Sequence, residues 1–240
     1  MRLLLISNST NRGEEFLTYP MPHIKEFLGD TSLDCLFIPY AGVSVTWDEL
    51  EKRVKARFEN IGHNIVSIHN FDDPVKAVEN AKAIVVSGGN TWNLLHTVRK
   101  NGLLELIRKR VLSGIPYIGW SAGSNLACPT IKTTNDMPII DPNGFDALNL
   151  IPFQINPHYL GSEDDHNYKT HGGETREERI KEFMVVNPNI YVAGLREGCM
   201  FVVENDRMRM IGKRTLRIFK NGIDTKEYEP NEDFTFLLKK

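Results

Sequence analysis

The chain has 240 residues, 41% hydrophobic and 25% charged, which is enough for one large α/β domain over residues 1–240 without metals or disulfides. Its 29 basic and 31 acidic side chains give a formal net charge of −2, which excludes a broad cationic surface for nucleic acid or anionic lipid. Cys35, Cys128 and Cys199 lack the spacing of a disulfide framework or a zinc site, so we expect reduced thiols.

The apolar run at the N-terminus covers only Leu3 to Ile6 before polar residues begin, which is too short for the core of a signal peptide. It predicts a buried first strand instead. No stretch approaches the roughly 20 apolar residues that a membrane helix needs. We therefore expect a cytoplasmic protein that does not enter a membrane.

Short apolar runs alternate along the chain with segments of helical spacing. Leu50, Val54 and Phe58 predict one helix, and the apolar set at residues 94–111 predicts helical structure that breaks near residue 101. Because continuous apolar strands are buried on both faces, we predict a doubly wound α/β fold with a mostly parallel sheet flanked by helices. The predicted strands are residues 3–7, 35–39, 64–68, 83–87, 117–119, 190–194 and 200–203.

The pattern changes after residue 213 to short alternating pieces at residues 215–219 and 234–237, with the turn signal Asn221-Gly222 between them. These pieces predict an antiparallel C-terminal edge rather than a second domain. Residues 130–178 contain four prolines and few helical signals. Long irregular segments inside a compact domain are usually functional, so we expect part of the site there.

The sequence G-W-S-A-G at residues 119–123 follows a predicted strand and precedes a predicted helix. This is the G-x-S-x-G pattern of a nucleophile elbow in its strand–turn–helix context. Flanking glycines allow a tight turn that holds Ser121 in a strained backbone geometry at the carboxyl end of the sheet. A small-residue turn that packs a helix on a strand fits the same residues, but the placement favours Ser121 as a nucleophile.

A second glycine loop, S-G-G-N at residues 87–90, also follows a predicted strand. Adjacent glycines let main-chain N–H groups approach a ligand closely, so Gly89 and Ala122 are our candidates for the two donors of an oxyanion hole. A phosphate loop is the weaker interpretation, because neither G-x-G-x-x-G nor G-x-x-x-x-G-K-[ST] is present.

Seven histidines could supply the base that a serine nucleophile needs. We favour His158, because it lies at a strand end followed by a loop. His166 and His171, in the same polar region, stay open as alternatives. Three others, His23, His63 and His96, lie in or beside predicted helices. His69 lies at a strand end without nearby functional partners.

Glu197 is the candidate acid, because it follows a predicted strand within G-L-R-E-G at residues 194–198. A solvated turn glutamate would show the same pattern. The chain order Ser121, His158, Glu197 differs from the Ser…Asp/Glu…His order of α/β-hydrolases, which disfavours a lipase or esterase.

The sequence resembles the peptidase E family of α-aspartyl dipeptidases, whose fold is similar to that of glutamine-amidotransferase domains. The resemblance spans about residues 1–205, and little of it is visible after Met210. It is carried by residues 3–10, 37–43, 88–91, 118–123, 128–131, 133–139, 141–148, 154–158, 173–177 and 194–198.

This resemblance implies a serine exopeptidase that acts without a metal or cofactor, with Ser121 as nucleophile, His158 as base and Glu197 as acid. The implied reaction is hydrolysis of the peptide bond after an N-terminal aspartate, through an acyl-enzyme. The expected partners are Asp-X dipeptides, and a homodimer is one assembly that the sequence allows.

The resemblance also implies that Arg176 helps to bind the aspartate, and a guanidinium fork matches a carboxylate. Asn90, Asp136 and Glu174 are further candidates for substrate binding, the last two for the α-ammonium group. A turn role for Asp136 and a helix-capping role for Glu174 fit the sequence equally well.

Two other functions stay open. One is a cyanophycinase-like or other serine hydrolase that acts on β-aspartyl bonds. The other is a noncatalytic α/β module that binds a small ligand through Gly88 and Gly89. A glutaminase is disfavoured, because Ser121 replaces the usual cysteine.

Overall fold

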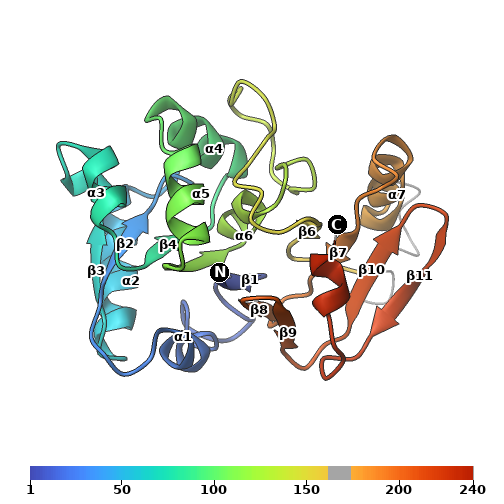
Figure 1. The fold of residues 1–240 in the computed structure, drawn as a ribbon, viewed down its shortest axis with the longest axis horizontal. Helices are drawn as coiled ribbons and strands as arrows, with labels where there is room; N and C mark the ends of the chain where they lie inside the picture. The colour runs from blue at the N-terminus through green and yellow to red at the C-terminus, as the bar shows by residue number, and fades with distance from the viewer. Residues whose placement is uncertain (162–173, 240) are drawn as a thin grey trace.

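The computed structural model describes residues 1–161 and 174–239. A seven-stranded sheet and a four-stranded sheet lie side by side, with helices packed against both (Figure 1). The larger sheet is mostly parallel, so the predicted doubly wound α/β class is confirmed.

The seven-stranded sheet has the strand order β3-β2-β4-β5-β1-β8-β9. Its first five strands run parallel, while β8 pairs antiparallel with β1 and β9 pairs antiparallel with β8. The sequence did not predict β9, because its alternating Arg and Met residues form no continuous apolar run. The strands are β1 (Arg2–Ile6), β2 (Asp34–Ile38), β3 (Asn64–Ser67), β4 (Ile84–Val86), β5 (Pro116–Trp120), β8 (Met200–Glu204) and β9 (Arg207–Ile211).

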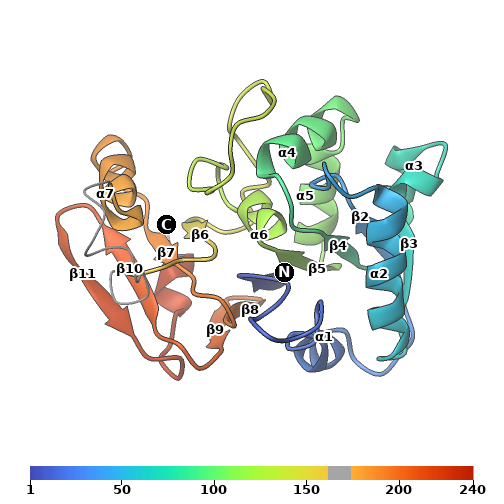
Figure 2. The same ribbon diagram turned by 180° about the vertical axis from the view of Figure 1, so that it is seen from behind.

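Helices cover both faces of this sheet (Figure 2). One face carries α1 (Met21–Leu28) and α2 (Trp47–Glu59), and the other carries α3 (Pro74–Asn80), α4 (Thr91–Lys100), α5 (Leu104–Leu112) and α6 (Ala122–Ala127). The central strand β1 shows the reason: Leu3 and Leu5 pack in the cluster with α3–α6, while Leu4 packs in the cluster with α1 and α2. All three are fully buried, as a strand between two helical layers requires.

The four-stranded sheet has the order β11-β10-β7-β6. Parallel strands β6 (Gln154–Asn156) and β7 (Val192–Gly194) are followed by the antiparallel hairpin β10 (Leu216–Lys220) and β11 (Ile223–Tyr228), with α7 (Arg176–Val186) packed on the sheet. The hairpin turns at Asn221-Gly222, as predicted, and forms the expected antiparallel edge. That edge belongs to the second sheet.

Two local predictions were wrong. The strand expected at residues 190–194 is β7, and it lies in the second sheet instead of the main one. Residues 234–237, expected as a strand, form most of the short 3₁₀ helix η2 (Thr235–Leu238). Phe234 and Leu237 are both buried, and a spacing of three places two side chains on one side of a 3₁₀ turn but on opposite faces of a strand.

All three cysteines are buried and unpaired, which agrees with the predicted reduced thiols. Over residues 1–161 and 174–239, no helix combines the length and the apolar character that crossing a bilayer requires.

Candidate active site

Ser121 lies between β5 and α6, at the carboxyl end of the main sheet, with φ of 52° and ψ of −110°. A positive φ is uncommon for a residue other than glycine, and such strain concentrates at functional sites. The turn is too tight for side chains at its glycines: a Cβ on Gly119 would lie 2.5 Å from Gly123 O, and one on Gly123 would lie 2.4 Å from Val86 O. The strand–turn–helix context of the G-x-S-x-G pattern is therefore present.

Ser121, His158 and Glu197 form one line of hydrogen bonds. Ser121 Oγ lies 2.8 Å from His158 Nε2, and His158 Nδ1 lies 2.6 Å from Glu197 Oε1. The strands β6 and β7 are parallel neighbours, so the residues that follow their carboxyl ends, His158 and Glu197, come to the same edge. The structure thus brings together the three residues that the sequence favoured, whereas His166 and His171 lie outside the described residues.

Charge and hydrogen bonding keep Glu197 ionised. The hydrogen bond from His158 lowers the pKa of Glu197; partial burial opposes this, while positive charge at His158, Arg214 and Arg176 adds to the lowering. An ionised carboxylate favours the imidazole tautomer with its proton on Nδ1. That tautomer directs the Nε2 lone pair at Ser121 Oγ.

Ser7 holds the backbone of the base, a role that the sequence analysis missed. The buried Ser7 Oγ accepts a hydrogen bond from His158 N–H at 2.9 Å and donates one to Leu195 O at 2.8 Å. His158 itself has a φ of 52°, so its backbone also lies in the left-handed region. A serine directly after the first strand was the available signal, because ligands bind beyond the carboxyl ends of parallel strands.

An ion-pair network anchors the loop after β7. The Arg196 side chain, only 3% exposed, donates to both carboxylate oxygens of Glu227 on β11, at 2.9 and 3.0 Å. Glu227 also pairs with Arg217 at 3.3 Å, and Arg217 pairs with Glu177 at 3.0 Å. These four residues, the Arg196 network, connect the loop of the candidate acid to the first turn of α7.

The two candidate oxyanion donors are main-chain groups in tightly packed turns. Gly89 has a φ of +137°, and a Cβ there would lie 2.2 Å from Ala41 O, so only glycine fits. The neighbouring Gly88 approaches the nucleophile, since a Cβ on it would lie 3.2 Å from Ser121 Cβ. Within residues 1–161 and 174–239, no backbone acceptor pairs with the N–H of Gly89 or of Ala122.

Two cavities share Asp136 in their walls. The triad cavity, of about 450 Å³, is lined by Ser121, His158 and the glycine loop, and the second cavity, of about 680 Å³, is lined by Arg176 and Glu174 among others. Arg53 of α2 also lines the triad cavity. The sequence analysis missed this cation, because it lies on a helix whose polar residues resemble an ordinary solvated face.

Two of the candidate substrate-binding residues have local partners. Asp136 Oδ2 accepts hydrogen bonds from Thr91 N–H at 2.8 Å and Thr91 Oγ1 at 2.6 Å. The Asn90 side chain caps α4 by accepting from Asn93 N–H at 3.0 Å, and it donates to Met137 O at 2.9 Å. These contacts order the start of α4 directly after the glycine loop.

The other two candidates lie at the start of α7. Arg176 is the first residue of the helix, and its guanidinium donates to His158 O, which places a cation next to the triad. Glu174 is 64% exposed and lies 3.7 Å from Arg179. Both side chains line the second cavity. The helix begins at a capping box, in which Thr175 accepts from Glu178 N–H at 3.1 Å.

A serine hydroxyl, an imidazole and a carboxylate in one hydrogen-bonded line are the arrangement of a serine hydrolase. The sequence profile of Peptidase family S51 matches residues 3–211. A Nostoc protein named Peptidase E is 49% identical over 100% of this chain and 97% of its own length, and an Escherichia coli Peptidase E is 46% identical over 98% and 100%. The chain belongs to Peptidase family S51 and is a serine-type hydrolase, so the resemblance is confirmed.

Solved structures share this fold at low sequence identity. The crystal structure of a peptidase from an acI-B1 actinobacterium matches with a TM-score of 0.69 at 16% identity, over 97% of this chain and 96% of its own. A Listeria monocytogenes structure matches with a TM-score of 0.64 at 23% identity, over 88% and 98%. At these identities the likeness supports the fold alone.

Proposed function

We propose that the protein is a dipeptidase that hydrolyses the peptide bond after an N-terminal aspartate, with Ser121, His158 and Glu197 as its catalytic triad. The observation that carries the proposal is the pair of contacts at 2.8 and 2.6 Å that joins these three side chains. The Peptidase E relatives, which match the chain over nearly its full length, support the same activity.

The reaction follows from the positions of the protons. His158 Nε2 takes the proton of Ser121 Oγ as that oxygen bonds to the scissile carbonyl carbon, and Glu197 stabilises the imidazolium that forms. The imidazolium then protonates the leaving nitrogen, and the C–N bond breaks to release the second residue as a free amine. A water molecule attacks the aspartyl ester by the same steps and regenerates Ser121.

The oxyanion of each tetrahedral intermediate lies between two main-chain donors in this proposal. Ala122 N–H points from the first turn of α6, where the helix dipole also favours negative charge, and Gly89 N–H comes from the adjacent loop. Removing one such donor from an enzyme of this kind costs about 10²–10³ in kcat. The close packing of Gly89 against Ala41 fixes that donor before the substrate arrives.

Selectivity for aspartate is assigned to Arg176. A buried carboxylate without a cationic partner costs several kcal/mol, whereas a guanidinium can pair with it through two parallel hydrogen bonds. Asp136 lines both cavities, so its carboxylate is our first candidate to bind the substrate ammonium. Glu174 lines only the second cavity and is more exposed, so it is the second candidate. Asn90 supports the site through the position of the glycine loop.

The test is release of free aspartate from Asp-Leu, compared with Asn-Leu and β-aspartyl-leucine. We expect Asp-Leu to be the best substrate, and Ser121→Ala and His158→Ala each to lower kcat by about 10⁴-fold or more, without additivity in the double variant. A Ser121→Ala protein that keeps more than about a tenth of the turnover would refute the mechanism. Preference for β-aspartyl-leucine would favour the alternative hydrolase.

Arg176 is tested by the ratio of kcat/KM for Asp-Leu and Asn-Leu. Arg176→Ala should lower kcat/KM for Asp-Leu by about 10²-fold, and Arg176→Lys should restore only part, because an ammonium lacks the planar fork. Thermal melts exclude unfolding as the cause. An unchanged ratio in Arg176→Ala would mean that another cation binds the aspartate side chain. Arg53, which lines the triad cavity, would then be the next candidate.

A further inference from the structure

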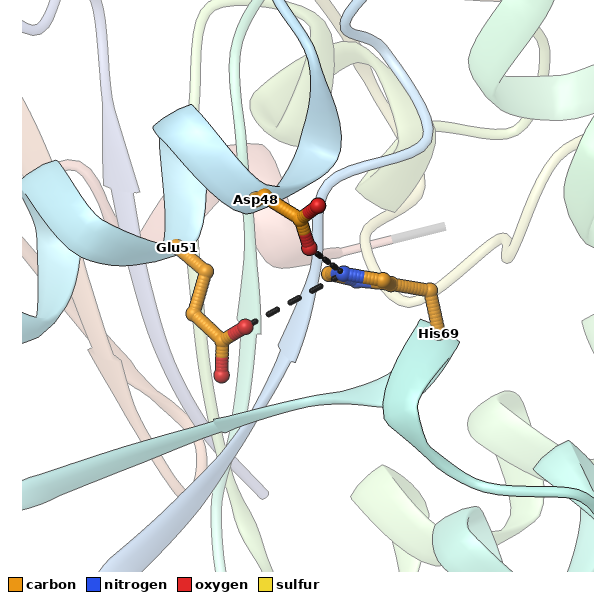
Figure 3. Close-up of side chains that lie close together, drawn as sticks. All are labelled: Asp48, Glu51 and His69. Carbon is orange, nitrogen blue, oxygen red and sulfur yellow. Dashed lines mark hydrogen bonds and ion pairs between the residues drawn. The ribbon is translucent and has the colours of Figure 1, made fainter.

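The one cluster of potential metal ligands among the described residues lies outside the triad. Asp48 and Glu51 project from the first turns of α2, and His69 lies in the short 3₁₀ helix η1 (Ile68–Asn70) that follows β3 (Figure 3). One ligand atom from each residue lies within 4.8 Å of the other two. The sequence analysis gave His69 no functional partner; the structure places two carboxylates beside it, from a helix about 20 residues earlier in the chain.

We propose that Asp48, Glu51 and His69 bind a divalent transition-metal ion, with zinc as the ion that the donor set favours. An imidazole nitrogen with two carboxylate oxygens is a set that zinc accepts, and water completes the coordination. His69 Nε2 lies 2.8 Å from Asp48 Oδ1 and 3.9 Å from Glu51 Oε2. Two donors on one tetrahedral zinc ion lie about 3.4 Å apart, so each of these two separations needs to change by about half an ångström.

Outer contacts already orient two of the three ligands. Ser67 Oγ lies 2.6 Å from His69 Nδ1, so a ring proton on Nδ1 can be donated to this hydroxyl while the Nε2 lone pair faces the carboxylates. Glu51 accepts hydrogen bonds from Ser67 N–H at 3.0 Å and from Asn70 Nδ2 at 2.9 Å. Binding of a cation therefore needs reorientation mainly of Asp48, whose side chain is 86% exposed.

Burial divides the cluster in the way that an open metal site requires. The His69 and Glu51 side chains are only 15% and 17% exposed, whereas Asp48 faces solvent and gives the ion a route in. Two carboxylates facing one imidazole nitrogen carry more negative charge than the imidazole can neutralise, and a divalent cation balances it. The ion would join α2 to the segment after β3. The proposal is independent of the peptidase mechanism.

The test uses the untagged full chain, freed of metal by chelator, and titrates it with Zn²⁺ in a calorimeter. We expect one strong site whose affinity falls by at least about 100-fold in His69→Ala and in Glu51→Gln, and by about 10-fold in Ser67→Ala. Controls are Glu59→Gln, which removes an exposed charge from the same helix, and His23→Ala. Both should bind as the wild type does.

A thermal melt gives the second readout. Zinc at about 100 times its Kd should raise the melting temperature of the wild type by about 5–10 °C, and that of His69→Ala by less than about 2 °C. Asp-Leu hydrolysis should persist in both His69→Ala and Glu51→Gln, which shows that they fold. Equal zinc affinity in the wild type and in a folded His69→Ala or Glu51→Gln variant would overturn the proposal, as would the absence of binding to the wild type.

Discussion

Glu227→Gln is expected to damage both stability and turnover, although Glu227 lies on β11 and not in the triad. The wild-type carboxylate forms two hydrogen bonds with Arg196, and glutamine keeps one acceptor but loses the charge. Two charge-assisted hydrogen bonds contribute about 3–6 kcal/mol together. Glu227 is 34% exposed, so hydrogen bonds to water compensate for part of this free energy in the variant. We therefore expect a loss of about 2–3 kcal/mol in the free energy of unfolding.

The expected decrease in melting temperature is about 5–10 °C for a chain of this length. Because Arg196 directly precedes Glu197, a displaced loop should also lower kcat by about 10-fold, with a smaller effect on KM. The assay pairs a thermal melt with Asp-Leu kinetics, and the control is Glu229→Gln, an exposed carboxylate just after β11. If Glu227→Gln melts within 2 °C of the control and keeps full turnover, the Arg196 network does not position the acid.

Three further predictions concern the oxyanion loop, metals and pH. Gly89→Ala should lower kcat by about 10²-fold or more, since its Cβ would lie 2.2 Å from Ala41 O; unchanged kinetics would exclude Gly89 as a donor. Dialysis against a strong chelator should leave Asp-Leu hydrolysis intact, because the triad supplies its own nucleophile; a loss that zinc restores would contradict this. The free energy of unfolding should decrease as pH falls below about 4.5, the ordinary pKa of a glutamate. Burial alone would raise the pKa of Glu227, but hydrogen bonds from Arg196, Thr215 and Arg217 and the charge of Arg196 together lower it; equal acid sensitivity in Glu227→Gln would refute the assignment.

The features that the sequence predicted are those that depend on residues close together in the chain. The elbow at Ser121 is a local pattern of glycines between a strand and a helix, and His158 and Glu197 each follow a short buried strand. Parallel strands bring such residues to one edge, so a place at a strand end favoured both residues, and the family resemblance then implied the full triad.

Contacts between distant elements were not predictable in the same way. Arg196 meets Glu227 31 residues later because β10 carries the hairpin back against β7, and one sequence gives no sign of that pairing. Ser7 supports His158 across 151 residues. The division into two sheets was also missed, because strand pairing between distant segments is not visible in the local pattern of a single sequence.

The two sheets also divide the triad. Ser121 follows a strand of the seven-stranded sheet, whereas His158 and Glu197 follow parallel strands of the four-stranded sheet. The contact between nucleophile and base therefore depends on the alignment of the two sheets, whereas the contact between base and acid joins residues that follow strands of the same sheet. A relative shift of about 1 Å is enough to cost about 10²-fold in rate. We therefore expect mild denaturant to abolish Asp-Leu hydrolysis before either sheet loses its secondary structure. Inactivation should precede the change in circular dichroism.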